Sequence, residues 1–387
     1  MPEVDMEELI ENLHQCRRCG ICRNAVYETV GFDGVCPVWR CSNGFETDFM
    51  RGKMLVALAL LDGRLKRTSE NLESIYRCSL CGNCTEICGA EFSPSETLET
   101  VRQVLSDFPI DIRDAIADRI AETGTPYVLG TGTKRDWVSE LDFDIPVSGK
   151  TVYFAGCTSS QKLKNVARST ARLLHKSGVD FTVLEEEPCC GSVLLRMGKA
   201  AQALENAQAF ADRIKDSGAE TVVVSCAGCM RTLTRDFPIG LGLELPEVVH
   251  IVDYAASLIS EEKISPKPLD MKIKVTYHDP CHLGRELGVF DSPRIILQSI
   301  PGVELVEMEP NRNQALCCGA GGGLRSFDSD LAKNIAADRI ETAMVTGASV
   351  VVTACPFCED NLHSGAQLAN RLIEVADVVE LLERSLT

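Results

Sequence analysis

The sequence lacks two features that would place the chain on nucleic acid or inside a membrane. Positive charge is scarce, since 39 Lys and Arg residues stand against 56 Asp and Glu residues and the net charge is −17. A surface this acidic repels phosphate backbones and offers no polybasic face to anionic lipid, so neither is an expected partner. Long apolar runs are also missing, because the stretch MLVALALL at 54–61 is too short to span a bilayer.

Signals for export and for nucleotide cofactors are lacking as well. The N-terminus, MPEVDMEELIENL, is acidic and has no apolar signal region, so we expect a cytoplasmic protein that meets a membrane only through a partner protein. The glycine-rich run GAGGG at 319–323 has no GxGxxG or Walker pattern around it. The chain carries no flavin or nicotinamide fingerprint, and a partner must therefore exchange electrons with it.

Cysteine is what the sequence has in excess, with 19 in 387 residues. In a chain of this length without a signal peptide, clustered cysteines indicate metal binding in a reducing compartment rather than disulfides. An odd number also cannot pair completely. The cysteines form three blocks, with nine from Cys16 to Cys88, five from Cys157 to Cys229 and five from Cys281 to Cys358.

The second and third blocks are an internal repeat. KTVYFAGC (150–157) corresponds to IKVTYHDPC (273–281), and GAETVVVSCAGC (218–229) corresponds to GASVVVTACPFC (347–358). In each copy, short β-branched runs such as TVVVS alternate with helical stretches, which predicts a parallel sheet covered by helices in a Rossmann-like α/β arrangement. The cysteines follow the predicted strands, at the carboxyl ends of the strands where open α/β folds bind ligands.

The first block has the spacing of two bacterial-type 4Fe-4S sites, because three closely spaced thiolates can hold three corners of a cubane. The two runs are Cys16-x2-Cys19-x2-Cys22 and Cys78-x2-Cys81-x2-Cys84-x3-Cys88. In two-cluster ferredoxins the fourth cysteine crosses to the other cluster. Cys88 would then complete the first triad, and Cys36, which precedes a proline, would complete the second.

Two departures from that pattern bear on the fourth ligands. Thirteen residues separate Cys22 from Cys36 where about three are usual, and Gly89 stands where proline usually follows the last cysteine. Cys41 is either a spare thiol or a fourth ligand in place of Cys36. Zinc is the alternative metal for CxxC pairs, but three cysteines on one tight turn suit a cluster corner better.

Each α/β repeat offers five thiols, one more than a cubane or a zinc site needs. The two sets are Cys157, Cys189, Cys190, Cys226 and Cys229, and Cys281, Cys317, Cys318, Cys355 and Cys358. Adjacent sulfurs converge on neighbouring metal atoms only in a turn, and Gly191 and Gly319, which follow the vicinal pairs, permit that backbone. The spacing therefore indicates a site that is larger or less symmetric than a cubane.

A family resemblance rests on these motifs. The pattern C-x31-CCG-x34-CxxC, repeated as C-x35-CCG-x35-CxxC, resembles the cysteine-rich CCG domain, and YFAGCTSS, YHDPCHLGR, ACPFCEDNL and RGKM strengthen the match. Over nearly its full length the chain is similar to the D-type component of heterodisulfide reductase. The resemblance implies two cubane and two non-cubane 4Fe-4S clusters, the latter held by the five-cysteine sets. It implies an α-helical ferredoxin-type domain at 1–110, a linker at 111–148, and CCG domains at 149–262 and 263–387.

The same resemblance implies an oxidoreductase that works within a complex. Electrons would pass from the two cubanes to the two non-cubane clusters, which reduce a disulfide or, in reverse, oxidise two thiols. The implied partners are a flavoprotein or a membrane cytochrome b and a small disulfide or thiol, for example coenzyme M–coenzyme B heterodisulfide. The complete duplication of the CCG set favours this function, because some iron–sulfur subunits of glycolate and lactate oxidases carry degraded sets.

Two other functions stay open from the sequence. The chain is alternatively the electron-transfer subunit of a flavin-linked 2-hydroxy-acid (glycolate or lactate) dehydrogenase or of an electron-transfer-flavoprotein system. A zinc-bound structural scaffold is the third reading. Iron content separates it from the first two, since four clusters need about sixteen iron atoms per chain.

Polar residues near the repeated cysteines are candidates for helping the chemistry. His278 and His282 flank Cys281, and they either donate protons to leaving thiolates and support cluster sulfurs, or hydrogen-bond to fix the turn after the strand. Three cations, Lys162, Arg231 and Arg285, balance the negative clusters, bind a carboxylated substrate, or lie on solvated surface.

Overall fold

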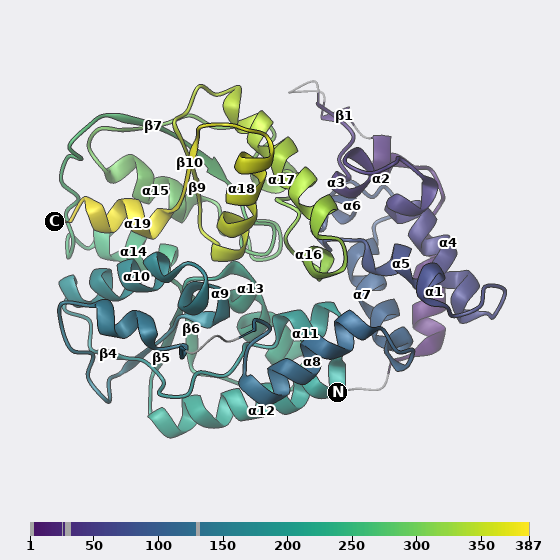
Figure 1. The fold of residues 1–387 in the computed structure, drawn as a ribbon, viewed down its shortest axis with the longest axis horizontal. Coiled ribbons are helices and arrows are strands. Elements are labelled where there is room, and N and C mark those ends of the chain that lie inside the picture. Colours follow the sequence, from purple (N-terminus) through teal and green to yellow (C-terminus); the bar gives the residue numbers. More distant parts are fainter. Residues whose placement is uncertain (1–3, 25, 28–31, 129–131, 387) are drawn as a thin grey trace.

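The computed structural model describes residues 4–24, 26–27, 32–128 and 132–386. An N-terminal helical domain lies to one side of two α/β domains, which stand one above the other in Figure 1. Two parallel-sheet α/β regions confirm the fold class expected from the repeat. No helix within these described ranges is both long and apolar enough to cross a lipid bilayer.

The N-terminal domain is built from short helices around a core of leucines and methionines, including Leu13, Met54 and Leu72. Its elements are α1 (Met6–Gln15), α2 (Ile21–Asn24), α3 (Pro37–Arg40), α4 (Met50–Leu61), α5 (Ser69–Tyr76), α6 (Asn83–Glu86) and α7 (Pro94–Val104), with a hairpin of β1 (Val26–Tyr27) and β2 (Phe32–Asp33). Helix α7 begins where Ser93 accepts a hydrogen bond from the Glu96 backbone and proline fills the first helical position.

The segment expected to be a linker, 111–148, contains helix α8 (Asp111–Thr123). The helix ends at Gly124, whose φ of +66° forms the left-handed C-cap that glycine favours. Its apolar face, with Ile116 and Ile120, packs together with Leu194 and Met197 of the first α/β domain. Part of the connection is therefore a packed element that joins the domains.

The first α/β domain contains a four-stranded parallel sheet in the order β4-β3-β5-β6. Its elements are β3 (Thr151–Phe154), α9 (Gly156–Gln161), α10 (Lys164–Lys176), β4 (Phe181–Thr182), α11 (Ser192–Arg196), α12 (Ala200–Ser217), β5 (Thr221–Val224), α13 (Ala227–Arg231), a π-helix (Thr232–Leu241), β6 (Glu247–His250) and α14 (Ile251–Ser260). The buried valines of β5 explain its central position, because a strand covered on both faces reads as a continuous apolar run.

The second α/β domain repeats this topology with the sheet order β8-β7-β9-β10. Its elements are β7 (Ile273–His278), α15 (Asp291–Ser299), β8 (Val303–Leu305), α16 (Leu324–Phe327), α17 (Ser329–Met344), β9 (Val350–Thr353), α18 (Pro356–Leu368), β10 (Glu374–Asp377) and α19 (Val378–Arg384). In both sheets the first strand of the repeat lies between the second and the third.

One expected element is shorter in the structure than in the sequence. The run DFTVLE at 180–185 predicts a strand, but β4 covers only Phe181 and Thr182. It is an edge strand that pairs with β3 over two residues, and the following acidic segment leaves the sheet. The vicinal cysteines therefore lie in loops and do not directly follow the strands.

The two α/β domains share one hydrophobic core. A single buried cluster includes Tyr153 and Val223 of the first domain and Tyr277 and Val351 of the second. Helices α10 and α14 meet α15 and α19 across the boundary, as their positions in Figure 1 show. This shared core fixes the position of the cysteines at the strand ends of one sheet relative to those of the other.

Candidate functional site

A cavity of about 570 Å³ lies between the two α/β domains. Nine of the ten repeated cysteines line it, namely Cys157, Cys189, Cys190, Cys226, Cys229, Cys281, Cys318, Cys355 and Cys358. Side chains from α8, including Ile112 and Arg119, close one part of the wall. The repeat thus brings two sets of thiols to one shared space.

The same local devices place the cysteines in each domain. Cys226 and Cys355 are the N-cap residues of α13 and α18, two residues after the last residues of the central strands β5 and β9. The vicinal pairs are followed by Gly191 and Gly319, whose φ values of +82° and +87° are in the left-handed region. A Cβ on Gly319 would lie 2.8 Å from the carbonyl oxygen of Ala332, so the position needs glycine for space as well as for conformation.

The thiols form a continuous series through both domains. Neighbours interact in the order Cys157, Cys189, Cys190, Cys229, Cys226, Cys355, Cys358, Cys318, Cys317 and Cys281. The step from Cys226 to Cys355 crosses the domain boundary. Within the second domain, the Sγ atoms of Cys318 and Cys358 are 3.3 Å apart. All of these cysteines are free thiols.

Crowding splits the pKa values of these thiols. Hydrogen bonds from Cys189 and then Cys229 lower the pKa of Cys190 to about 5, and comparable bonds from Cys317 and Cys358 lower that of Cys318 well below its usual value. The pKa of Cys157 is raised well above its usual value, first by the hydrogen bond with Cys189 and then by burial. Thiols crowded in this way cannot all lose their protons unless metal cations take the place of the protons. The donor set therefore fits an iron–sulfur centre.

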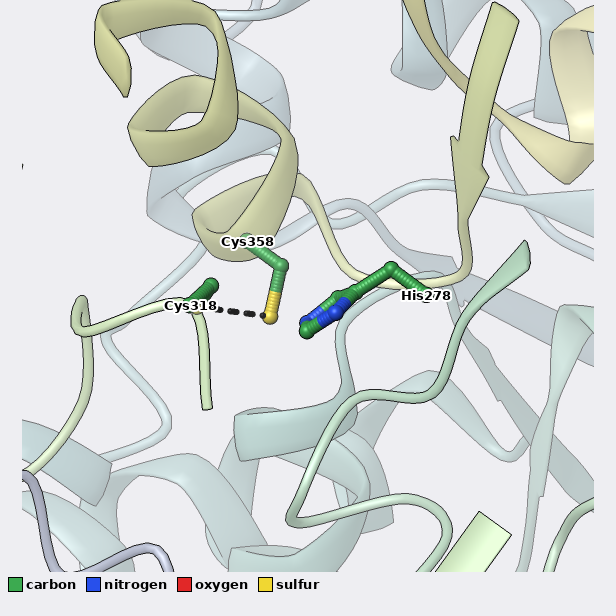
Figure 2. A group of neighbouring side chains, drawn as sticks. All are labelled: His278, Cys318 and Cys358. Atoms are coloured by element: carbon green, nitrogen blue, oxygen red, sulfur yellow. Dashed lines mark hydrogen bonds between the residues drawn. The ribbon is translucent and has the colours of Figure 1, made fainter. Parts of the chain in front are cut away.

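His278 lies beside the thiols of Cys318 and Cys358, as Figure 2 shows. One of its ring nitrogens and the Sγ atoms of Cys318 and Cys358 all lie within 4.8 Å of one another. Arg339 donates from Nε to His278 Nδ1 at 3.3 Å, while Nε2 is buried without a hydrogen-bond partner in the described part of the chain. Burial first, and then the Arg339 charge, lowers the pKa of His278 to about 3.

His282 lies at the cavity itself and is 7% exposed. Burial, followed by the charge of Arg231, lowers its pKa to about 3 as well. Its Nε2 has no hydrogen-bond partner among the described residues. Both histidines therefore face the cysteine sets as neutral imidazoles near pH 7.

The three cations singled out in the sequence occupy different environments. Lys162 is exposed at the cavity, with its amino group 5.3 Å from the centre of the Tyr127 ring. Arg231 is buried in a network of ion pairs with acidic residues from three parts of the chain. Arg285 donates to the backbone carbonyl oxygens of Cys81, Asn313 and Ala315. Only Lys162 of the three is exposed at the cavity.

A second, small cavity of about 20 Å³ in the N-terminal domain is lined by Cys36, Cys78, Cys81 and Cys84. Lys53 also lines it and is 1% exposed. Its amino group donates hydrogen bonds to the backbone carbonyl oxygens of three residues. The structure thus brings Cys36 to the second triad, which fits the four-thiol donor set of a cubane. Cys41 packs against the hydrophobic cluster that contains Val38, with Asp338 close enough to raise its pKa after burial.

The first triad lies nearer the surface. Cys19 is exposed, and Cys16 and Cys22 are half-buried. Burial, with smaller contributions from the charges of Cys16 and Cys19, raises the pKa of Cys22 to about 11. Cys88 follows α6, where its N–H donates to the Thr85 carbonyl, and its place as the fourth ligand stays a prediction.

The buried N-terminal set meets the second α/β domain directly. The thiol of Cys81 is hydrogen-bonded to that of Cys317, which is the largest cause of its raised pKa. A Cβ on Gly322 would lie 2.5 Å from the Cys78 carbonyl oxygen, so the GAGGG run is pressed against the cysteine turn. The series of thiols therefore continues from the repeated domains into the N-terminal domain.

Arg102 joins the three domains and was missed by sequence reasoning. Its buried guanidinium donates to the carbonyl oxygens of Cys78 in its own domain, Arg196 in the first α/β domain and Gly322 in the second. Lys53 and Arg339 were also missed as functional residues, although RGKM drew attention to the first. A basic residue in a helix gives no sequence signal that its partner is the backbone of a distant segment.

Comparison with known proteins agrees with this architecture. The chain matches the cysteine-rich (CCG) domain family over residues 151–234 and 275–363, and the 4Fe-4S dicluster domain over residues 12–92. It is 36% identical over 405 residues to the D component of the dihydromethanophenazine:CoB–CoM heterodisulfide reductase of Methanosarcina acetivorans, covering 100% of this chain and 98% of that protein.

More distant relatives share the same core. The B component of the fumarate reductase (CoM/CoB) of Methanothermobacter marburgensis is 32% identical over 319 residues, covering 80% of this chain and 61% of the relative. The EtfAB:quinone oxidoreductase of Syntrophomonas wolfei is 29% identical over 339 residues, covering 81% and 47%. A crystal structure of a hypothetical protein from Helicobacter pylori shares the fold, with a TM-score of 0.59 at 8% identity over 99% of this chain and 77% of that one.

The folds and cysteine sets thus define an iron–sulfur oxidoreductase with a duplicated CCG domain. The chain belongs to the family formed by the D components of heterodisulfide reductases.

Proposed function

We propose that this chain is the part of a complex that reduces a disulfide in the cavity between its CCG domains. The reaction is R–S–S–R′ + 2 e⁻ + 2 H⁺ → RSH + R′SH, and it runs in reverse when two thiols are oxidised. The observation that supports it most strongly is the cavity lined by nine cysteines from two complete five-thiol sets. Each α/β domain contributes one set to the lining, so each sulfur of a bound disulfide would have its own set.

Four groups of cysteines would hold the iron. Cys16, Cys19, Cys22 and Cys88 would bind one cubane, and Cys36, Cys78, Cys81 and Cys84 a second. The sets Cys157, Cys189, Cys190, Cys226 and Cys229, and Cys281, Cys317, Cys318, Cys355 and Cys358, would each bind a non-cubane cluster. When bound, iron–sulfur clusters take up and pass on single electrons, a chemistry that protein side chains alone do not supply.

The depth of the cysteine sets supports a direction for electron entry. Cys19 is exposed, Cys81 is buried, and Cys81 adjoins Cys317 of the second CCG domain. A partner protein, either a flavoprotein or a membrane cytochrome b, would dock over the exposed triad. Two electrons delivered one at a time from this side match the two-electron reduction of a disulfide.

The cavity wall suits a substrate with anionic substituents. Arg119, Lys162 and Arg325 all line it, although Arg325 is paired with Asp360. The names of several relatives specify the CoB–CoM heterodisulfide, which makes that compound the first candidate substrate. His282 places at the cavity a ring nitrogen with no partner among the described residues, and a neutral N–H there can donate a hydrogen bond to a thiolate as the S–S bond breaks.

The native complex, purified without oxygen, tests the proposal. Reduced viologen as electron donor and CoB–CoM heterodisulfide as acceptor should give turnover, and the protein should contain about sixteen iron atoms per chain. Oxidation in the presence of a thiol product should also give a substrate-dependent EPR signal. Zinc in place of iron, or iron without any thiol-dependent signal, would contradict disulfide chemistry at this site.

A second candidate is the electron-transfer role that the EtfAB:quinone oxidoreductase relative suggests. In that case, substrate chemistry would lie on an FAD-linked partner such as a 2-hydroxy-acid dehydrogenase. Reduction of this chain by lactate or glycolate through its partner, without disulfide turnover, would favour the second candidate.

A further inference from the structure

The two CCG domains differ at one position of the first strand. Phe154 pairs with Val224 in the first sheet, and His278 pairs with Thr353 in the second. Both partners stand two residues before the first cysteine of the CxxC motif. Phe154 and His278 are therefore equivalent residues, one a hydrocarbon ring and the other an imidazole.

A second position changes together with the first. The spacing from Phe210 in α12 to the C-capping Gly218 equals the spacing from Arg339 in α17 to Gly347, and both glycines have a φ of +69°. Phe210 and Arg339 are thus also equivalent. In the first domain the rings of Phe154 and Phe210 pack edge to face with centroids 5.0 Å apart. In the second domain Arg339 donates to His278 instead.

Each pair lies against the equivalent cysteines of its own domain. Phe154 and Phe210 share a buried cluster with Cys190 and Cys229. A ring nitrogen of His278 lies within 4.8 Å of the sulfurs of Cys318 and Cys358, which are the counterparts of those two. The thiols of the first CCG domain therefore pack against two phenyl rings, whereas those of the second lie next to an imidazole and a guanidinium.

Arg339 fixes the tautomer of His278. A guanidinium has only donors, so Nδ1, which accepts from Arg339 Nε, cannot carry the ring proton. The proton of the neutral imidazole is then on Nε2, a buried atom with no partner in the described ranges. Arg339 itself donates to the Pro310 carbonyl and forms no ion pair with any described residue. A fixed N–H donor backed by a buried positive charge is thus held against the thiols of one domain alone.

The structure assigns His278 the role of a positioning residue that donates its Nε2–H to cysteine sulfur of the second CCG set, with Arg339 holding the tautomer. This inference rests on the proposed function and adds an order to it. Hydrogen bonds to ligand sulfur and nearby positive charge stabilise the more negative, reduced state and raise the reduction potential. The second set, which also adjoins Cys81, is therefore the easier of the two to reduce and receives the first electron.

Potentiometric titration of the anaerobic native complex, followed by EPR and Mössbauer spectroscopy, tests this order. The expected result is that His278→Phe, which copies the first domain, moves the midpoint potential of one CCG centre to lower values and leaves the other unchanged. His278→Gln keeps a side-chain N–H donor and should shift that potential less. Phe154→Leu is the matched control in the first domain and should not move the centre that His278→Phe moves.

Arg339→Gln provides an independent measurement if His278→Phe fails to assemble. It removes the charge and keeps side-chain donors, and it should lower the potential of the same centre. Unchanged potentials in His278→Phe and Arg339→Gln, or equal shifts of both CCG centres, would overturn the inference while leaving disulfide reduction intact. Iron content at the wild-type level in each variant keeps these results distinct from failure of the proposed function. That failure would appear in the unmodified complex, as missing iron or as a missing thiol-dependent EPR signal.

Discussion

The two cysteine triads of the N-terminal domain share one spacing but lie in different environments. Cys19 of the first is exposed, and the nearby Arg51 is paired with Glu46. Cys81 of the second is buried, and the charges of Lys53 and Arg102 act on Cys78 of the same triad. Among the described residues, these two cations donate to backbone carbonyl oxygens. One spacing therefore occurs in two settings, and the surrounding fold distinguishes an exposed triad, where we propose that electrons enter, from a buried triad that meets the second CCG domain.

The largest expected loss of turnover comes from replacing a predicted ligand of the buried triad. Cys81→Ser should lower disulfide turnover by more than about 100-fold, with either the native partner or reduced viologen as donor, because a ligand matters more than the outer groups that cost 10–100-fold. Cys19→Ser should reduce partner-driven turnover but retain viologen-driven turnover. Steady-state assays of both variants check this, and equal losses with both donors in Cys19→Ser would contradict an entry role for the first triad.

The next largest effect concerns stability. Arg102→Met leaves buried carbonyl oxygens of three domains without a donor, and it should lower the free energy of unfolding by about 3–5 kcal/mol. Anaerobic chemical denaturation measures the change. Arg17→Met, an exposed arginine beside the first triad, is the matched control and should stay within about 0.5 kcal/mol. A loss under about 1 kcal/mol in Arg102→Met would show that water replaces the guanidinium.

Alkylation of the iron-free protein should distinguish the thiols by depth. Cys19 is exposed and should react with iodoacetamide before the buried Cys81. Cys22, whose pKa burial raises to about 11, is only about one thousandth thiolate at pH 8, and its reaction should accelerate as the pH rises toward 11. Peptide mass spectrometry over a pH series measures this order. Early modification of Cys81 would contradict the burial of the second set.

The smallest expected effect is electrostatic. Lys53→Met removes a buried cation beside Cys36 and Cys78 and should lower the midpoint potential of the buried cubane by up to about 60 mV, a tenfold change in its equilibrium constant. The potential of the exposed cubane should not change. Redox titration followed by EPR compares the two, with the exposed Lys66→Met as control. A shift of both potentials would mean that the change is not local.

Sequence reasoning predicted the features that repeat or have a fixed spacing. The doubled parallel sheet and the helices after TVVVS and VVVT follow from periodicity, and the glycines after both vicinal pairs adopt positive φ. It did not predict that β4 would shorten at the sheet edge or that α8 would pack into the expected linker, because both depend on tertiary contacts. Arg102 and the His278–Arg339 pair were beyond reach for the same reason, since each acts on a partner far away in the sequence.

The glycine run at 319–323 has a consequence for how this junction can vary. Gly322 lies so close to the Cys78 turn that the first carbon of any side chain would collide with its backbone. The two domains can approach this closely because Gly322 has no side chain. A single added methyl group would push the two domains apart. It would thereby lengthen the distance over which we propose that electrons pass between them.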